Sequence, residues 1–406
     1  QTMVTDMTGL DISNASLLDE STAAAEAMVL MYRSLRNRNT FLVSDQCHPQ
    51  TIDVLKTRSR PIGINLKVLA TEEFVFNEET FGCLIQCPTT DGKVFSYKEL
   101  AKSAHDSGAY IAVATDLLSL AIIAEPGSYD ADIAIGSTQR FGVPLGFGGP
   151  HAAFLAAKEN FKRKMPGRII GLSKDADDNL AFRMALQTRE QHIRRDKATS
   201  NICTAQVLLS VIAGMYAVYH GPDGIYQIAK TVHEKTKNLA SSLKENGFEI
   251  KHDQFFDTIR FGANGKNINF EKLKANLRIY ENGDIGISVD ETTSQNDINE
   301  LLQFFECGED SKNDYTLKEI RSSKYLTHEV FNSYHSETKM MRYLKKLETK
   351  DLSLNTSMIS LGSCTMKLNA AAEMIPISWP EFNSIHPFAP ESQTLGYQEL
   401  FDSLEK

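Results

Sequence analysis

The fold is indicated most clearly by one apolar run, Tyr110-Ile111-Ala112-Val113-Ala114-Thr115, which follows Gly108 and ends at Asp116. A continuous apolar run of this length between turn-forming residues is typical of a strand that is covered on both faces. Such strands occur mainly in parallel sheets with helices on both sides. The segment therefore predicts a parallel sheet in an α/β protein.

The neighbouring segments repeat this strand and helix alternation. We predict further strands at Thr40 to Ser44, Ile64 to Leu69, Phe81 to Gln86 and Asp132 to Gly136. We predict helices from Ser21 and Thr22, which can cap a helix, to about Arg36, from Gln50 to Thr57, and from Tyr97 to Ser107. This order favours a large, doubly wound α/β domain.

The pattern changes near Gly221, which suggests a second unit. Residues 223–307 read as a smaller α+β domain, with helices at Tyr226 to Glu245, Phe270 to Asn276 and Asn296 to Glu306. We therefore predict a large domain at 1–222, the small domain at 223–307, a charged and irregular linker at 308–350, and the start of a further unit at 351–406.

Composition excludes several classes of protein. The 406 residues are 42% hydrophobic and 23% charged, which is typical of a globular chain. A net charge of -9 gives no electrostatic case for nucleic acid or an anionic membrane surface. The longest apolar stretch, Val207 to Tyr219, is shorter than the roughly 20 residues that span a bilayer, so we interpret it as a buried helix.

The cysteines and histidines indicate no metal site. The six cysteines form no CxxC pair and have no histidine at zinc-finger spacing, so we expect reduced thiols and no structural metal. We expect a structural role for each of five histidines, which have no cysteine, aspartate or serine partner at a fixed spacing: His48, His151, His192, His220 and His386.

One arrangement resembles a cofactor site. In pyridoxal-phosphate enzymes of the aspartate aminotransferase fold, a strand-end Asp pairs with the pyridinium nitrogen, a lysine forms an imine and a helix N-terminus holds the phosphate. Here Asp116 supplies the carboxylate, and Ser21 and Thr22 supply the helix start. No lysine occurs between Lys102 and Lys158, so this site cannot anchor the cofactor covalently. The alternative is that Asp116 only caps a turn.

Three further motifs carry weaker signals. The glycine-rich loop 144–150 allows close approach to a phosphate, although a tight interface turn fits it better. The basic stretch 183–197 could clamp a carboxylate or phosphate, or it is a solvated or inter-subunit face; its charged residues are Arg183, Arg189, Glu190, Arg194, Arg195, Asp196 and Lys197. Cys364 lies near Lys367, which would lower the pKa of a thiol, although a cysteine without a catalytic role is commoner.

Long runs of the sequence resemble the P-protein family of the glycine cleavage system, the decarboxylating glycine dehydrogenases. The matching runs extend from one end of the chain to the other. They are Met7 to Ile12, Asn14 to Glu20, Gln139 to Pro144 with Gly148 to His151, Ala185 to Arg195, Cys203 to Gln206, Gly362 to Asn369, Trp379 to Phe382, and Ile385 to Phe388.

The resemblance implies the fold and the place of this chain in a longer protein. Family members carry two related halves, each with the aspartate aminotransferase-like fold (fold type I), and only the second half binds pyridoxal phosphate through its lysine. The alignment places Gln139 at the lysine position. We therefore expect a fragment: a degenerate first half, followed from 351 by the opening of a truncated catalytic half.

The resemblance also implies a reaction and its partners. The whole enzyme would decarboxylate glycine and transfer the aminomethyl group to the lipoyl arm of the H protein, with pyridoxal 5'-phosphate bound through the missing C-terminal half. It would be a homodimer of two-half chains or a heterotetramer. It would lie in the mitochondrial matrix if eukaryotic and in the cytoplasm if bacterial.

For this chain alone we expect a supporting role and no catalytic residue. The candidate pocket border for the second half comprises Gly362, Ser363, Cys364, Thr365, Lys367 and Asn369. One alternative is a non-catalytic scaffold or regulatory paralogue. Another is a distinct pyridoxal-phosphate enzyme such as a transaminase, which the absent lysine disfavours.

Overall fold

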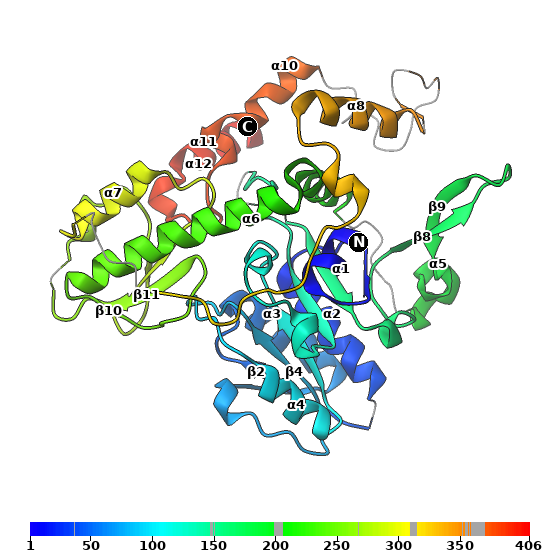
Figure 1. Ribbon diagram of the computed structural model, residues 1–406, viewed down its shortest axis with the longest axis horizontal. Helices are drawn as coiled ribbons and strands as arrows, with labels where there is room; N and C mark the ends of the chain where they lie inside the picture. The colour runs from blue at the N-terminus through cyan, green and yellow to red at the C-terminus, as the bar shows by residue number, and fades with distance from the viewer. Residues whose placement is uncertain are drawn as a thin grey trace.

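The computed structural model defines the arrangement of two sheets and their helices (Figure 1). It describes residues 1–35, 37–146, 149, 151–198, 206–266, 268–308, 315–350, 352, 353, 356, 358 and 370–406.

The larger sheet has seven strands in the order β1-β7-β6-β5-β4-β2-β3. The five parallel strands are β2 (Thr40–Ser44), β3 (Asn65–Leu69), β4 (Thr80–Gln86), β5 (Tyr110–Ala114) and β6 (Ile133–Ser137). β7 (Ala153–Ala157) runs antiparallel to β6 and pairs with the short β1 (Ile12–Ser13). The predicted parallel sheet is confirmed, with an antiparallel edge that the sequence analysis did not include.

Helices cover both faces of this sheet, because alternate side chains of the buried strands enter two separate cores. On one face α2 (Glu20–Ser34) and α3 (Pro49–Ser59) pack over Phe41 and Val43. On the other, α1 (Thr2–Thr8), α4 (Lys98–Asp106) and the first part of α6 (Val207–Glu245) pack over Ile111 and Val113. This confirms the doubly wound architecture.

Most predicted elements of this domain lie within two residues of the observed ones, with two corrections. No element was predicted before Ser21, yet residues 2–8 form α1. The helix at the apolar stretch exists, but its burial is only partial: Val207, Leu208 and Val211 are 60%, 70% and 46% exposed.

The smaller sheet is antiparallel. Its order is β10 (Glu249–Ile250), β11 (Thr258–Gly262), β13 (Ile285–Ser288) and β12 (Arg278–Ile279). α7 (Gln295–Phe304) and the second part of α6 cover it. α6 breaks at Gly221, where φ is 64° and Pro222 follows. The predicted helix over Phe270 to Asn276 is wrong: only a 3-10 turn forms, at Phe270–Lys272.

Close backbone packing joins the two sheets. Gly92 has a φ of 95°, and a Cβ atom there would lie 2.0 Å from the carbonyl oxygen of Thr258 in β11. Beside it, the Asp91 carboxylate lies 2.8 Å from the His252 ring. A larger residue at 92 would separate these surfaces, so glycine is required there.

The segment after the small sheet is partly regular. Residues 308–350 were predicted to be irregular, yet they include α8 (Glu337–Glu348) and bury Tyr315, Leu326 and Phe331. Arg321 donates hydrogen bonds to the Asp6, Met7 and Leu120 carbonyls. This segment is therefore fixed to the large domain. The proposed domain limits remain a prediction.

The remaining elements lie outside both sheets. β8 (Ile169–Lys174) and β9 (Leu180–Ala185) form a two-stranded ribbon that is followed by α5 (Gln191–Arg194). The C-terminal helices are α10 (Ala371–Met374), α11 (Pro380–Asn383) and α12 (Leu395–Glu405). None of the helices described is long and apolar enough to cross a membrane.

Candidate functional site

The carboxyl ends of β5 and β6 bring several charged residues to one edge of the large sheet. Asp116 follows β5, while Gln139 and Arg140 follow β6, and parallel strands end at the same edge. The small sheet contributes acids from the start of β11 and the end of β13. We call this group the strand-end cluster: Glu20, Asp116, Gln139, Arg140, Asp257 and Glu291.

Arg140 lies at the centre of the strand-end cluster. Its Nη1 donates to Asp257 Oδ2 at 2.5 Å and lies 3.6 Å from Asp116 Oδ2. Its Nε lies 3.6 Å from Glu291 Oε2. Because Asp257 and Glu291 belong to the small sheet, the guanidinium links the two sheets through charge. The Asp116 carboxylate therefore already has a cation beside it.

The hydrogen bonding of the cluster is incomplete. Asp116 Oδ2, Gln139 Nε2, and Arg140 Nε and Nη2 are buried and have no hydrogen-bond partner in the described part of the chain. The 3.6 Å ion-pair distances exceed those of a hydrogen bond. Attraction between charges, rather than a complete hydrogen-bond network, holds the group together.

The crowded carboxylates resist ionisation. Burial raises the pKa of Asp116 despite the opposing charge of Arg140. Burial, with smaller effects from Asp116 and Asp19, raises the pKa of Glu20 to about 7. Burial likewise raises the pKa of Glu291. Three carboxyl groups around one guanidinium, with Glu20 near Asp116, leave this edge without an excess of positive charge.

The start of α2 is capped by a carboxylate, not by a hydroxyl. Asp19 is the N-cap, and its Oδ1 accepts a 2.6 Å hydrogen bond from the Thr22 amide. The prediction that Ser21 and Thr22 cap this helix is wrong, because both lie inside it; Ser21 Oγ is 3.2 Å from Thr51 Oγ1 instead. A charged acceptor at Asp19 satisfies the free amide more strongly than a hydroxyl would.

These observations test whether the strand-end cluster fits pyridoxal phosphate. Gln139 supplies a carboxamide where an imine needs an amine. The Asp19 carboxylate caps the helix start that would have to receive a phosphate, and Glu20 adds a second carboxyl group there. Arg140 occupies the ion-pairing position beside Asp116. The residues present do not fit the cofactor.

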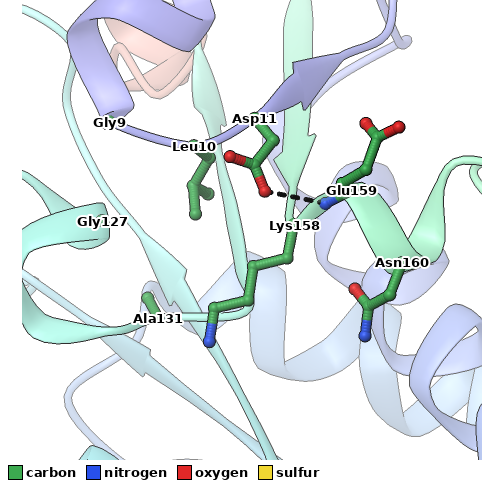
Figure 2. A pocket seen from close by; sticks show the side chains of 8 residues that line it. All are labelled: Gly9, Leu10, Asp11, Gly127, Ala131, Lys158, Glu159 and Asn160. Carbon is green, nitrogen blue, oxygen red and sulfur yellow. Dashed lines mark hydrogen bonds between the residues drawn. The ribbon is translucent and has the colours of Figure 1, made fainter.

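A separate hollow of about 370 Å³ lies at the opposite edge of the sheet, where the parallel strands begin (Figure 2). Its lysine, Lys158, follows β7 and pairs with Asp130 Oδ1 at 2.7 Å and Asp132 Oδ1 at 3.1 Å. Burial would lower the pKa of Lys158, but the two carboxylates outweigh it and raise that pKa. This amine is held protonated and is not placed for imine chemistry with Asp116.

The basic stretch 183–197 divides into buried and exposed residues. Arg189 is only 3% exposed and donates a 3.0 Å hydrogen bond to the Gly167 carbonyl. Arg183, Arg194, Arg195 and Lys197 are exposed. Arg189 therefore supports the base of the ribbon, and the four exposed cations do not form one clamp with it.

The remaining predicted residues belong to the candidate pocket border, to the glycine-rich loop and to the histidines. All six residues of the candidate pocket border, Gly362 to Asn369, lie outside the described residues, as do Phe147, Gly148 and Pro150 of the glycine-rich loop. Gly146 of that loop donates to the Asn383 carbonyl at 2.9 Å. His48 contacts Thr90 and Gln86 at 3.0 Å, and desolvation by its neighbours together with the charge of Arg278 lowers its pKa.

The described cysteines are free, and the described residues contain no group able to hold a metal ion. Cys47, Cys83 and Cys87 are buried, and burial raises the pKa of each thiol. They pack as small apolar side chains in the core.

Comparison with known proteins places this architecture in a family. The model of the family "Glycine cleavage system P-protein" matches residues 1–305. The chain belongs to this family. Glycine dehydrogenase (decarboxylating) of Nostoc punctiforme is 56% identical over 429 residues, a match that covers 100% of the chain and 44% of that protein. The mitochondrial enzyme of Mus musculus is 51% identical, with 100% and 41% covered.

Solved structures agree with this assignment. The crystal structure of glycine decarboxylase (P-protein) of the glycine cleavage system has a TM-score of 0.67 and 31% identity, and covers 75% of this chain and 74% of that one. At 11% identity, a C-DES mutant with glycine covalently linked to its PLP cofactor has a TM-score of 0.53 over 75% and 84% of the chains. The second likeness shows the fold alone, and the predicted fold type is confirmed. The chain spans less than half the length of its curated relatives.

The sequence pattern indicates Asp116 and Gln139 as site residues but not Arg140, Asp257 and Glu291. The Asp257 partner lies 117 residues beyond Arg140, so no local pattern joins them. One signal in the sequence was available, because Arg140 directly follows Gln139, the residue that we align with the family's lysine. An arginine there suggests that a cation of the protein replaces the cationic ring of the cofactor beside Asp116.

Proposed function

We propose that this chain is part of a glycine dehydrogenase (decarboxylating) and acts as its cofactor-free first half. The whole enzyme decarboxylates glycine with pyridoxal phosphate and transfers the aminomethyl group to the lipoyl arm of the H protein. The cofactor supplies the electron acceptor for loss of the carboxyl group, and the second half holds it. Family membership and coverage of only part of each relative support this proposal.

The observation that carries the proposal is the misfit of the strand-end cluster. A half that bound cofactor would need an amine, a free anion site at α2 and an unpaired Asp116. Here Gln139, Asp19 and Arg140 occupy those three positions. We infer that this half contributes surface and support, while the second half performs the chemistry.

We also propose a role for the border segment Gly362 to Asn369. It opens the second unit in sequence, and a polar, glycine-containing loop suits the edge of a cofactor pocket. Lys367→Met should lower turnover of the full-length enzyme at least tenfold and leave its thermal midpoint within about 2 °C. Unchanged turnover would remove this segment from the site.

The proposed partners are glycine and the lipoylated H protein, with the other components of the system. The assembly would be a homodimer of two-half chains or a heterotetramer. The relatives from Mus musculus and Dictyostelium discoideum are named mitochondrial. We infer the mitochondrial matrix for a eukaryotic source and the cytoplasm for a bacterial one.

A second candidate function is a scaffold or regulatory paralogue, which the absence of a fitting cofactor site among the described residues also favours. One experiment separates the two. The full-length product of the gene is purified, supplied with pyridoxal phosphate, carboxyl-labelled glycine and lipoylated H protein, and assayed for labelled CO2. Release of labelled CO2, with cofactor trapped by borohydride on a lysine beyond residue 406, supports the enzyme. No release, with no trapped cofactor, supports the scaffold.

A further inference from the structure

The ribbon of β8 and β9 stands clear of the body of the molecule (Figure 1). Its antiparallel register pairs Ile170 with Met184, Leu172 with Phe182, and Lys174 with Leu180. Paired residues lie on the same face of a ribbon, and neighbouring pairs alternate between faces. Five apolar side chains therefore share one face, with Lys174 beside them at the tip. We call these five residues the apolar ribbon face: Ile170, Leu172, Leu180, Phe182 and Met184.

This face is exposed and one-sided. Leu172, Leu180 and Phe182 are 63%, 73% and 77% exposed. The opposite face carries Gly171, Ser173, Ala181 and Arg183, which are small or polar, and its base pair Ile169 and Ala185 packs on the core of the large domain. Random exposure of single apolar residues is ordinary, but a continuous apolar face with a polar reverse side indicates a surface that another body covers.

The ribbon is a formed structure. At its base the Gln1 side chain accepts from the Ile170 amide at 2.8 Å and donates to the Ile170 carbonyl at 3.0 Å. At its tip Asp175 Oδ1 accepts from the Asp177 and Asn179 amides, both at 2.9 Å. Two-stranded ribbons are marginal by themselves, so a fixed ribbon with an apolar face benefits from a permanent cover.

The described part of this chain does not provide that cover. β8 and β9 make extensive contacts only with each other among the described elements. Figure 1 shows the ribbon far across the view from α10, α11 and α12, the chain's own exposed C-terminal helices. An anionic lipid surface is disfavoured, because Asp175, Asp177 and Asp178 lie at the tip.

We propose that the apolar ribbon face packs against the second half of the longer protein. The chain matches 44% of the Nostoc punctiforme relative, so more than half of that protein lies outside this match. A body on the same polypeptide is present at high effective concentration, and permanent interfaces are the most apolar ones. This inference rests on the proposed function only in requiring the longer protein.

Photo-crosslinking in the full-length protein tests the contact. Phe182→p-benzoylphenylalanine places the probe on the apolar ribbon face, and Ser173→p-benzoylphenylalanine places it on the polar face as the matched control. Crosslinked peptides are identified by mass spectrometry. We expect position 182 to crosslink at least fivefold more than position 173, to residues beyond 406. Crosslinks to residues 1–406 of another copy, or equal yields at both positions, would overturn the proposal.

A second measurement introduces charged residues into the apolar ribbon face and follows proteolysis. Leu172→Asp with Phe182→Asp should release the ribbon from the second half, so that it can enter the protease, and speed tryptic cleavage at Arg183 at least tenfold in the full-length protein, while Ser173→Asp should leave the rate within twofold. Equal rates in all three proteins would contradict docking. Labelled CO2 release is recorded in parallel. Crosslinks beyond 406 without CO2 release would retain the docking and reject the proposed function, and the reverse result would do the opposite.

Discussion

The large sheet has charged residues both where its parallel strands end and where they begin, and the two groups differ in which cation the carboxylates hold. At the carboxyl edge, the strand-end cluster surrounds one arginine with carboxylates and contains no amine. At the other edge, Lys158 supplies an amine that Asp130 and Asp132 hold. The aspartate and the lysine that imine chemistry requires together are therefore on different edges.

The comparison teaches how a cofactor-type fold persists without the cofactor. Each charge that would face a ligand faces another protein group instead. Arg140 joins the two sheets at one edge, while Asp132 joins β5, β7 and α4 at the other through Ile111, Lys158 and His105. The charged residues at both edges therefore hold elements of the fold together. Substitutions there should lower the free energy of unfolding and should have little direct effect on a reaction.

The largest expected effect is at Arg140. Arg140→Ala leaves three carboxyl groups of the strand-end cluster without their cation, and loss of one partner of a mostly buried ion pair costs about 3 kcal/mol in the free energy of unfolding. Urea unfolding followed by circular dichroism measures it. Arg58→Ala, which breaks an exposed pair with Glu26 at 2.6 Å, is the control and should cost under about 1 kcal/mol. Equal costs would show that Arg140 is not a structural cation.

The next effect is at the opposite edge. Asp132 is 4% exposed and accepts from the Ile111 amide, the His105 ring and Lys158. Asp132→Asn removes the charge and one acceptor, which should cost about 2 kcal/mol by the same measurement. The side chain of its neighbour Asp130 is 71% exposed, so Asp130→Asn should cost under about 1 kcal/mol. A larger loss for Asp130 would reverse our description of this edge.

A smaller effect depends on pH. The pKa of Glu20 is about 7 in the folded protein, above its usual value of 4.5, so the folded state binds the additional proton. This contribution to stability is fully present below pH 4.5 and is lost as pH rises through 7. Glu20→Gln should therefore stabilise the protein by at least about 1 kcal/mol at about pH 8 relative to its effect at about pH 4.5.

Glu99 provides the control for this pH dependence, because it lies in the first turn of α4 and is exposed. Glu99→Gln should change the free energy of unfolding by less than about 0.5 kcal/mol at either pH. A Glu20→Gln effect that is the same at both pH values would contradict the burial of Glu20 beside Asp116 and Asp19.

The smallest expected change is in cofactor binding, where we expect that a lysine introduced at position 139 brings no gain. Gln139→Lys introduces an amine at the position that we propose to match the lysine of the second half, yet Arg140 still pairs with Asp116, and the carboxyl groups of Asp19 and Glu20 still lie at the start of α2. We expect no absorbance band of a pyridoxal-phosphate imine after addition of cofactor at a tenfold excess. A stoichiometric band would show that the missing lysine is the only defect.

The sequence predicted those parts of the fold that local patterns determine. The strand at Thr40–Ser44 was placed correctly because its apolar run lies between turn signals. β7 was missed, since Ala153-Phe154-Leu155-Ala156-Ala157 lacks β-branched residues and is a strand only through pairing with β6. The false helix at Phe270 to Asn276 had helix-forming composition, but a segment of this length is too short for local composition alone to stabilise a helix.

The candidate site was predictable in outline only. Asp116 could be placed at a strand end, and the missing lysine could be counted. The Arg140 contacts with Asp257 and Glu291 depend on how the small sheet packs on the large one, which no local pattern encodes. The cap at Asp19 was missed because Ser21 and Thr22 are also good capping residues, and only the backbone geometry distinguishes them.

Covalent trapping of the cofactor is the most direct test that this half is a support and not a catalytic unit. The 406-residue protein is incubated with pyridoxal phosphate, reduced with borohydride and analysed by intact mass and peptide mapping. We predict scattered labelling of exposed lysines, well below one cofactor per chain, and none concentrated at one position. One lysine labelled at a stoichiometry near one would contradict the account.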